Sequence, residues 1–241
     1  GGGQWTGGTL SGTGNPATST LEFTQDSSFL ISNNVALAGR IIQNSGALTW
    51  AGTTITASNG GYINNLEKGR VFGVGFSTLA GGGAFFNNGF VRATEMSRLN
   101  FSGVVTTYSG TFEADMGANV QNFGQINFYN TVVSFGGDPY TADPNNVKEE
   151  NFTGGGEIVA RANAVIAGAT TSSCQGFFFD GITTIDSTFT TRGGGGGAGE
   201  SHFAGSLLVN GTLSTDGLGS SVHLEGSAEI ADNGQIVTGG L

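Results

Sequence analysis

The chain has 241 residues, enough for one well-buried core or for one elongated repeat domain. Its formal net charge is −10 and its 8 basic residues form no cluster, which excludes the basic stripe of a general nucleic-acid binder and disfavours binding to an anionic membrane surface. There are 45 glycines but only 3 prolines, and charged residues make up 11%. Together with regularly spaced Phe, Ile, Val and Leu, this composition excludes collagen and a disordered tract and favours many short strands joined by tight bends.

The single cysteine, Cys174, excludes an intramolecular disulfide framework, and its apolar and small neighbours predict a buried residue. Scarce cysteine is compatible with export and does not establish it. No apolar run approaches the roughly 20 residues of a membrane helix. The sequence starts at Gly1 without a methionine or a signal peptide, which leads us to expect a processed product or an excised fragment.

Residues 1–20 are rich in glycine and threonine and predict either a flexible lead or a first, irregular coil. Trp5 and Leu10 are apolar anchors, so a short strand is expected around residues 4–10, with a loop through Asn15 and Pro16 after it. From Leu21 onward, apolar side chains alternate with polar or small ones, as in strands with one buried face. Asn and Gly separate these strands because both tolerate positive φ.

The bend-strand unit recurs at a nearly constant spacing. The Gly-x-apolar starts at Gly89 and Gly110 are 21 residues apart, and those at Gly211 and Gly234 are 23 apart. A period of 21–23 residues with two or three short strands predicts an all-β fold, a single-domain parallel β-solenoid over residues 21–241. The alternative is a β-sandwich with strands every 8–12 residues.

Two stretches interrupt the period and are expected to be loops: residues 136–151, which are acidic and contain Asp-Pro turns, and residues 192–202, which contain five consecutive glycines. Between them, residues 157–167 predict a single strand, with an Ala-rich capping helix as the alternative. The pattern then returns to regular alternation from Ser206 to the end.

The acidic loop gathers oxygen ligands of the kind that calcium prefers, and its candidate metal ligands are Asp138, Asp143, Asn145 and Glu149. The loop has neither EF-hand spacing nor a Gly-Gly-x-Gly-x-Asp repeat, so a solvated acidic loop is the alternative. Calcium is the one cofactor that the sequence suggests.

Other polar residues have a structural and a chemical interpretation. Six asparagines at bends are expected to form a stacked internal ladder of amides: Asn44, Asn65, Asn88, Asn122, Asn210 and Asn233. Four carboxylates could pair for glycoside hydrolysis, although isolated surface carboxylates explain them better: Asp180, Asp186, Glu200 and Asp216.

Two further groups of residues have weaker functional interpretations. His202 and His223 are 21 residues apart, about one coil, and could stack as neighbours; two histidines make an incomplete metal site, and chance spacing is the simpler interpretation. Four aromatic residues would offer sugar-stacking platforms if exposed, and burial is the alternative: Trp5, Trp50, Tyr62 and Tyr140.

The units Asn122-Phe123-Gly124-Gln125-Ile126-Asn127-Phe128 and Asn233-Gly234-Gln235-Ile236-Val237 resemble the right-handed parallel β-helix of autotransporter passenger domains and related bacterial surface adhesins. Pectin-lyase-like enzymes share this fold, but their acidic catalytic motifs are not visible in this sequence, and fold likeness alone transfers no activity.

The resemblance implies a secreted or cell-surface, non-enzymatic structural or adhesive solenoid whose partners are other copies of itself, glycans or a host surface. Unpaired strand edges at the ends suggest a filament subunit. The alternatives are a carbohydrate-active β-helix, acting as a polysaccharide lyase or hydrolase, and a glycan-binding module without catalysis.

Overall fold

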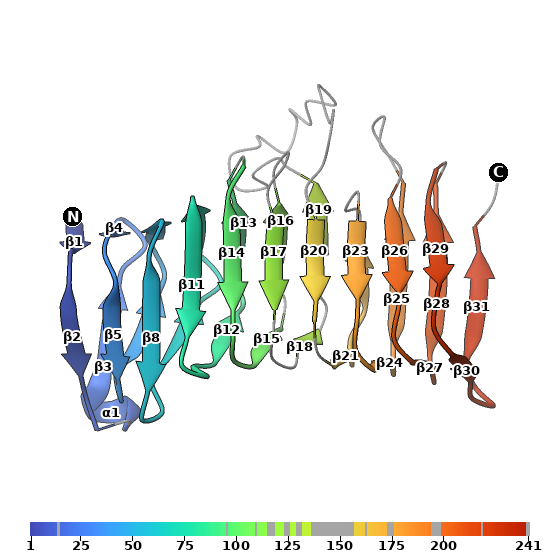
Figure 1. Ribbon diagram of the computed structural model, residues 1–241, viewed down its shortest axis with the longest axis horizontal. Coiled ribbons are helices and arrows are strands. Elements are labelled where there is room, and N and C mark those ends of the chain that lie inside the picture. The colour runs from blue at the N-terminus through green and yellow to red at the C-terminus, as the bar shows by residue number, and fades with distance from the viewer. Residues whose placement is uncertain are drawn as a thin grey trace.

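The structure of the protein is a computed structural model. It describes residues 1–13, 15–94, 96–108, 110–114, 119–122, 126–128, 132–135, 157–161, 163–172, 176–193, 199–217 and 219–239. The chain winds into a parallel β-solenoid in which each coil adds one strand to each of three sheets (Figure 1). The predicted all-β solenoid is therefore confirmed, and the alternative β-sandwich is wrong.

The three sheets contain eleven, ten and ten strands, and we call them sheets A, B and C. Sheet A is formed by β1 (Gly2–Trp5), β4 (Ser28–Ile31), β7 (Ala47–Ala51), β10 (Arg70–Val74), β13 (Phe90–Ala93), β16 (Thr111–Ala114), β19 (Val132–Phe135), β22 (Thr170–Ser172), β25 (Thr188–Arg192), β28 (Thr212–Asp216) and β31 (Gln235–Thr238). Sheet B is formed by β2 (Gly8–Ser11), β5 (Val35–Ala38), β8 (Thr54–Ser58), β11 (Phe76–Ala80), β14 (Arg98–Phe101), β17 (Asn119–Asn122), β20 (Glu157–Ala160), β23 (Gly176–Phe179), β26 (Glu200–Phe203) and β29 (Ser221–Leu224). Sheet C is formed by β3 (Thr20–Phe23), β6 (Ile41–Asn44), β9 (Tyr62–Asn65), β12 (Phe85–Asn87), β15 (Val105–Thr107), β18 (Ile126–Phe128), β21 (Ala164–Ile166), β24 (Thr183–Ile185), β27 (Leu207–Val209) and β30 (Ala228–Ile230).

The first residues of the chain form strands of the solenoid. A single strand was expected around residues 4–10, but the structure has two, β1 and β2, separated by a bend at Gly7. β1 pairs with β4, and β2 pairs with β5. The loop expected at Asn15 and Pro16 leads into a short helix, α1 (Pro16–Ser19). Two backbone amides near the end of α1, those of Thr18 and Ser19, donate to the carbonyl of Asn15, which accounts for this single turn.

Coil length varies more than the period of 21–23 residues suggested. Hydrogen-bonded residues on neighbouring coils are 19 positions apart for Arg161 and Asp180 but 24 apart for Thr190 and Ser214. The difference is taken up at the corners, because the strands themselves stay in parallel register.

The predicted interruptions are only partly right. Residues 136–151 lie outside the described residues. The loop expected at 192–202 is shorter than predicted, because Arg192 ends β25 and β26 begins at Glu200. Residues 157–167 form two strands, β20 and β21, and neither a single strand nor a helix. The exposed Arg161 lies between them.

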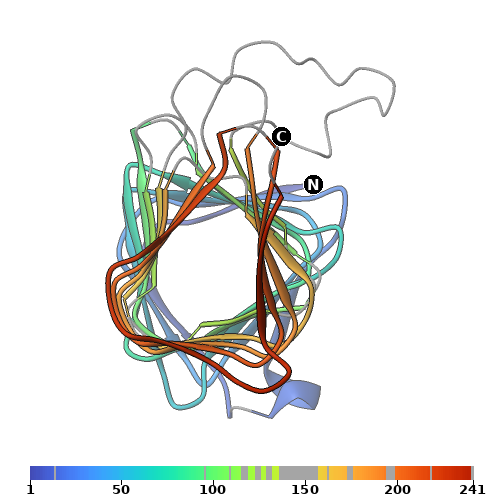
Figure 2. The same cartoon turned by 90° about the vertical axis from the view of Figure 1, so that its right-hand side faces the viewer.

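Seen along its length, the solenoid is a stack of coils around one interior (Figure 2), which apolar side chains fill. Alternation produces this filling, since β7 and β9 bury every second residue. Trp50 meets Phe85 and Phe101 with ring centroids 6.2 and 6.0 Å away, and all three side chains are buried. Within the described ranges, no helix is long and apolar enough to cross a membrane.

A buried ladder of asparagine amides runs along the corner between sheets C and A. Asn44 Nδ2 donates to Asn65 Oδ1 at 2.8 Å, and Asn65 Nδ2 donates to Asn87 Oδ1 at 2.8 Å. The same amide groups donate to the backbone carbonyls of Arg70 and Phe90 on the strands that follow the corner. Each amide therefore links its own coil to the next one in a water-excluded position, where hydrogen bonds of this kind are most effective.

The predicted ladder is confirmed for Asn44 and Asn65 and is wrong elsewhere. Asn87, and not Asn88, is its third member. Asn122 lies in sheet B, and Asn210 donates instead to Asp186 Oδ1 at 2.7 Å. Asn233 lies in an exposed turn.

Glycines let the coils approach closely beside this ladder. A Cβ at Gly89 would overlap the carbonyl oxygens of Leu66 and Gly69, and one at Gly110 would overlap the Asn87 amide. The Asn-x-Gly pattern of the sequence thus has two functions at this corner: the amide links the coils, and the glycine leaves the space for that link.

We predict that Asn65→Ala lowers the free energy of unfolding by about 2 kcal/mol or more, because it leaves buried polar partners unsatisfied on both neighbouring coils. The adjacent Asn64 is half-buried on the outer side of the same strand, so Asn64→Ala should change stability by less than about 0.5 kcal/mol. Urea unfolding of both variants measures the difference, and equal effects would contradict the structural role of the ladder.

We also predict that Gly89→Ala destabilises the solenoid by about 1–3 kcal/mol, because the added methyl group must displace two backbone carbonyls. Gly2→Ala is the control, since the nearest atom to its Cβ would be 3.5 Å away. Thermal unfolding followed by circular dichroism should show a clearly lower midpoint for Gly89→Ala only; an unchanged midpoint would show that the corner can relax.

Candidate functional site

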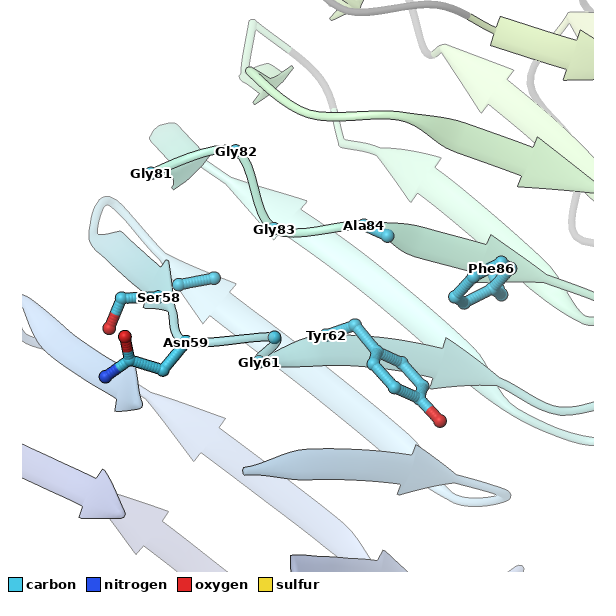
Figure 3. A pocket seen from close by; sticks show the side chains of 11 residues that line it. Ser58, Asn59, Gly61, Tyr62, Gly81, Gly82, Gly83, Ala84 and Phe86 are labelled. Atoms are coloured by element: carbon cyan, nitrogen blue, oxygen red, sulfur yellow. The ribbon is translucent and has the colours of Figure 1, made fainter. Parts of the chain in front are cut away.

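A shallow hollow lies at the corner between sheets B and C, where the turns after β8 and β11 stack on each other. Its volume is about 370 Å³, and Figure 3 shows the residues that line it. The Asn59 turn has a positive φ of 52°, and Gly61 donates its amide to the Ser58 carbonyl at 2.9 Å. The next coil contributes Gly81, Gly82 and Gly83. A Cβ at Gly81 or Gly83 would overlap Ala57, so these two glycines let the turns pack closely, whereas a Cβ at Gly82 would meet nothing within 4 Å.

The two ends of this hollow differ in chemistry. Ser58 and Asn59 form a polar end, whereas Tyr62 and Phe86 form an aromatic end on β9 and β12 (Figure 3). The two rings meet edge to face with centroids 5.3 Å apart and an interplanar angle of 83°. An aromatic wall beside polar groups and exposed glycine backbone suits a small polar ligand with one apolar face, such as a sugar ring.

Two aromatic residues proposed as sugar platforms have other positions. Trp50 is fully buried among core rings, and Trp5 is also buried, with its Nε1 donating to the Gly7 carbonyl at 3.0 Å. Tyr140 lies outside the described residues. Phe86, whose ring packs against Tyr62, was not proposed as a sugar platform from the sequence. It is the register partner of Asn64 on the next coil and so lies diagonally across from Tyr62.

The proposed calcium ligands, Asp138, Asp143, Asn145 and Glu149, all lie outside the described residues, so calcium binding by that stretch remains a prediction.

Each of the four carboxylates considered for glycoside hydrolysis contacts a group of another kind. Asp180 pairs with Arg161 at 2.6 Å and Asp216 pairs with Arg192 at 3.0 Å. Asp186 accepts from Asn210, and Glu200 lies 3.3 Å from His202 Nε2. The contacts of Asp180, Asp186 and Asp216 link neighbouring coils on the outer surface, which is the arrangement expected for structural carboxylates, whereas Glu200 contacts His202 within β26.

The two histidines stack on adjacent coils. His202 and His223 are register partners in β26 and β29, and their ring centroids are 4.3 Å apart with an interplanar angle of 7°. Their spacing of one coil is therefore not a coincidence. Glu225, which contacts His202 Nδ1 at 3.0 Å, was not identified from the sequence. The sequence feature that could have indicated this contact is the position of Glu225, 23 residues after His202 and so close to one coil length.

The last described coil exposes apolar side chains. Its inward-facing residues Leu224, Ile230 and Ile236 are 45%, 50% and 40% exposed. The residues that precede them in the same three columns are at most 1% exposed: Phe203, Val209 and Leu213. Among the described strands, β29, β30 and β31 each pair on one side only, so this coil combines free backbone edges with an apolar face.

No protein-family model, no curated protein and no solved structure matches this chain. The geometry of the end coil, the hollow and the outer surface is therefore the basis for assigning a function.

Proposed function

We propose that this chain is a secreted or cell-surface, non-enzymatic structural or adhesive β-solenoid that assembles by stacking its last described coil against the first coil of another copy. The observation that carries the proposal is the apolar face formed by Leu224, Ile230 and Ile236, together with the unpaired edges of their strands. An uncovered parallel edge with an apolar face readily accepts a further strand layer.

The first coil offers a matching surface. Strands β1, β2 and β3 each pair on one side only, within the described part of the chain, and Leu10 and Leu21 on this coil are half-buried beside the core. Joining the last coil of one copy to the first coil of the next is a head-to-tail contact. Such a contact does not close on itself, and it therefore produces a filament and not a closed dimer.

Three observations support the extracellular, non-catalytic part of the proposal. The chain has one cysteine, and its Asn-x-Gly-x-apolar units resemble those of autotransporter passenger β-helices and surface adhesins. Of the four carboxylates considered for hydrolysis, three contact arginines or an amide on a neighbouring coil, and Glu200 contacts the imidazole of His202 in its own strand.

We predict that the chain of residues 1–241 forms filaments or head-to-tail oligomers at high concentration, and that Ile230→Lys suppresses them by placing a charge in the stacking face. Ile182→Lys is the matched control, because Ile182 is 55% exposed in the body of the solenoid. Electron microscopy and sedimentation measure assembly. A chain that stays monomeric at high concentration, or equal assembly by both variants, would contradict the proposal.

A second candidate function, glycan binding without catalysis, is favoured by the Tyr62–Phe86 pair beside the hollow. We predict that a glycan array detects sugar binding that Tyr62→Ala reduces by about tenfold or more, since a stacking contact worth about 1.4 kcal/mol corresponds to that factor. Tyr108→Ala is the control, because Tyr108 is an exposed tyrosine outside the hollow. Binding that both variants retain would remove the hollow as the glycan site.

A further inference from the structure

We propose that Glu200, His202 and His223 form a binding site for a divalent transition-metal ion, Zn²⁺ in the first instance, on the outer face of sheet B. One potential ligand atom from each of the three residues lies within 4.8 Å of the others. The chain contains only 2 histidines, and both are in this cluster. The inference does not rest on the proposed assembly function.

The topology of the solenoid explains why these three residues meet. Glu200 and His202 are two positions apart in β26, so both face outward, and parallel pairing places His223 of β29 opposite His202. His202 Nε2 faces Glu200 Oε2 at 3.3 Å, and His223 Nε2 faces Ser221 Oγ at 3.1 Å. Since Ser221 is the register partner of Glu200, the Nε2 atoms of both rings lie on the same side of the cluster.

His202 is held in place before any ion binds. Its ring stacks between Phe178, with centroids 4.6 Å apart, and His223, and its side chain is only 16% exposed. Glu225 Oε1 lies 3.0 Å from His202 Nδ1 on the opposite side from Glu200. When a carboxylate accepts a hydrogen bond from the Nδ1–H of a histidine, the proton stays on Nδ1 and the Nε2 lone pair is free for a metal. Metal-ligating histidines are usually supported by such a hydrogen bond.

The donor set selects the class of ion. Two imidazoles and one carboxylate suit zinc with a fourth position for water, whereas calcium and magnesium prefer sites made of oxygen ligands. The chain's net charge of −10 also favours the approach of a cation.

Binding requires a small rearrangement that the structure permits. Ligand atoms around tetrahedral zinc are roughly 3.3 Å apart at the usual bond lengths, so the present donors must converge. His223 is exposed, and its ring can turn out of the stack toward the anchored Nε2 of His202. The ion would then join β26 to β29, which is the last described strand of sheet B, and would hold the outermost coil to the body of the solenoid.

The test is an isothermal titration of residues 1–241 with Zn²⁺, in a Cys174→Ser background so that the thiol does not contribute. We expect one ion per chain in this cluster. Binding should be lost in His202→Gln and His223→Gln, and Glu225→Gln should weaken it about 10–100-fold by removing the support of His202. Glu229→Gln, which removes an exposed carboxylate from β30, should leave affinity unchanged.

A second measurement needs no variant. Zn²⁺ should perturb the ring-proton NMR signals of both histidines and slow amide exchange in β29, whereas Ca²⁺ should do neither. Zinc that leaves either histidine signal unperturbed, or that binds with equal affinity after His202→Gln and His223→Gln, would overturn the proposal. The absence of zinc binding at millimolar concentration would overturn it as well.

Discussion

Parallel register between coils is the constraint on which the other features of this molecule depend. Because each strand lies directly over its counterpart, the side chains of one column share a fixed spacing of about 4.8 Å, so successive residues of a column must fit together in size and shape. The column Ile31, Trp50, Gly73 and Ala93 illustrates this. Trp50 is followed in its column by the small residues Gly73 and Ala93, and Phe85 and Phe101 pack against it from the other sheets. A Cβ at Gly73 would come within 3.1 Å of the Leu99 side chain.

The same constraint explains what the sequence could and could not predict. Alternation and a coarse period were sufficient for the fold, because strand pleating and coil stacking depend on those two quantities alone. Corner positions required more than a period. Asn87 and Asn88 both precede Gly89, and which amide faces inward depends on which residues of the preceding strand face inward. Asn87 is two residues after the buried Phe85 and therefore lies on the same face of β12.

Sites that combine residues from several coils were harder to identify. Coils here differ in length by several residues, so a fixed period does not align columns far along the chain. The spacing of 21 residues between His202 and His223 lies within the predicted period, so their stacking was considered from the sequence, although chance spacing was the simpler interpretation. Glu225 was missed because it lies beyond the end of β29, where alternation no longer indicates which way a side chain points. Phe86 was missed because an outward-facing aromatic residue in the sequence looks the same as a core one.

The two proposals for the last described coil use opposite faces of β29 and do not compete. His223 lies on the outer face with the metal-ligating residues, whereas Leu224 continues the interior column of Phe203. A strand paired on one side only has fewer contacts to offset its conformational entropy, so ordering it before a new coil is added lowers the cost of that addition. An ion that joins β26 to β29 would supply this order without covering the edge. Metal binding on the outer surface would therefore favour stacking at the end of the solenoid.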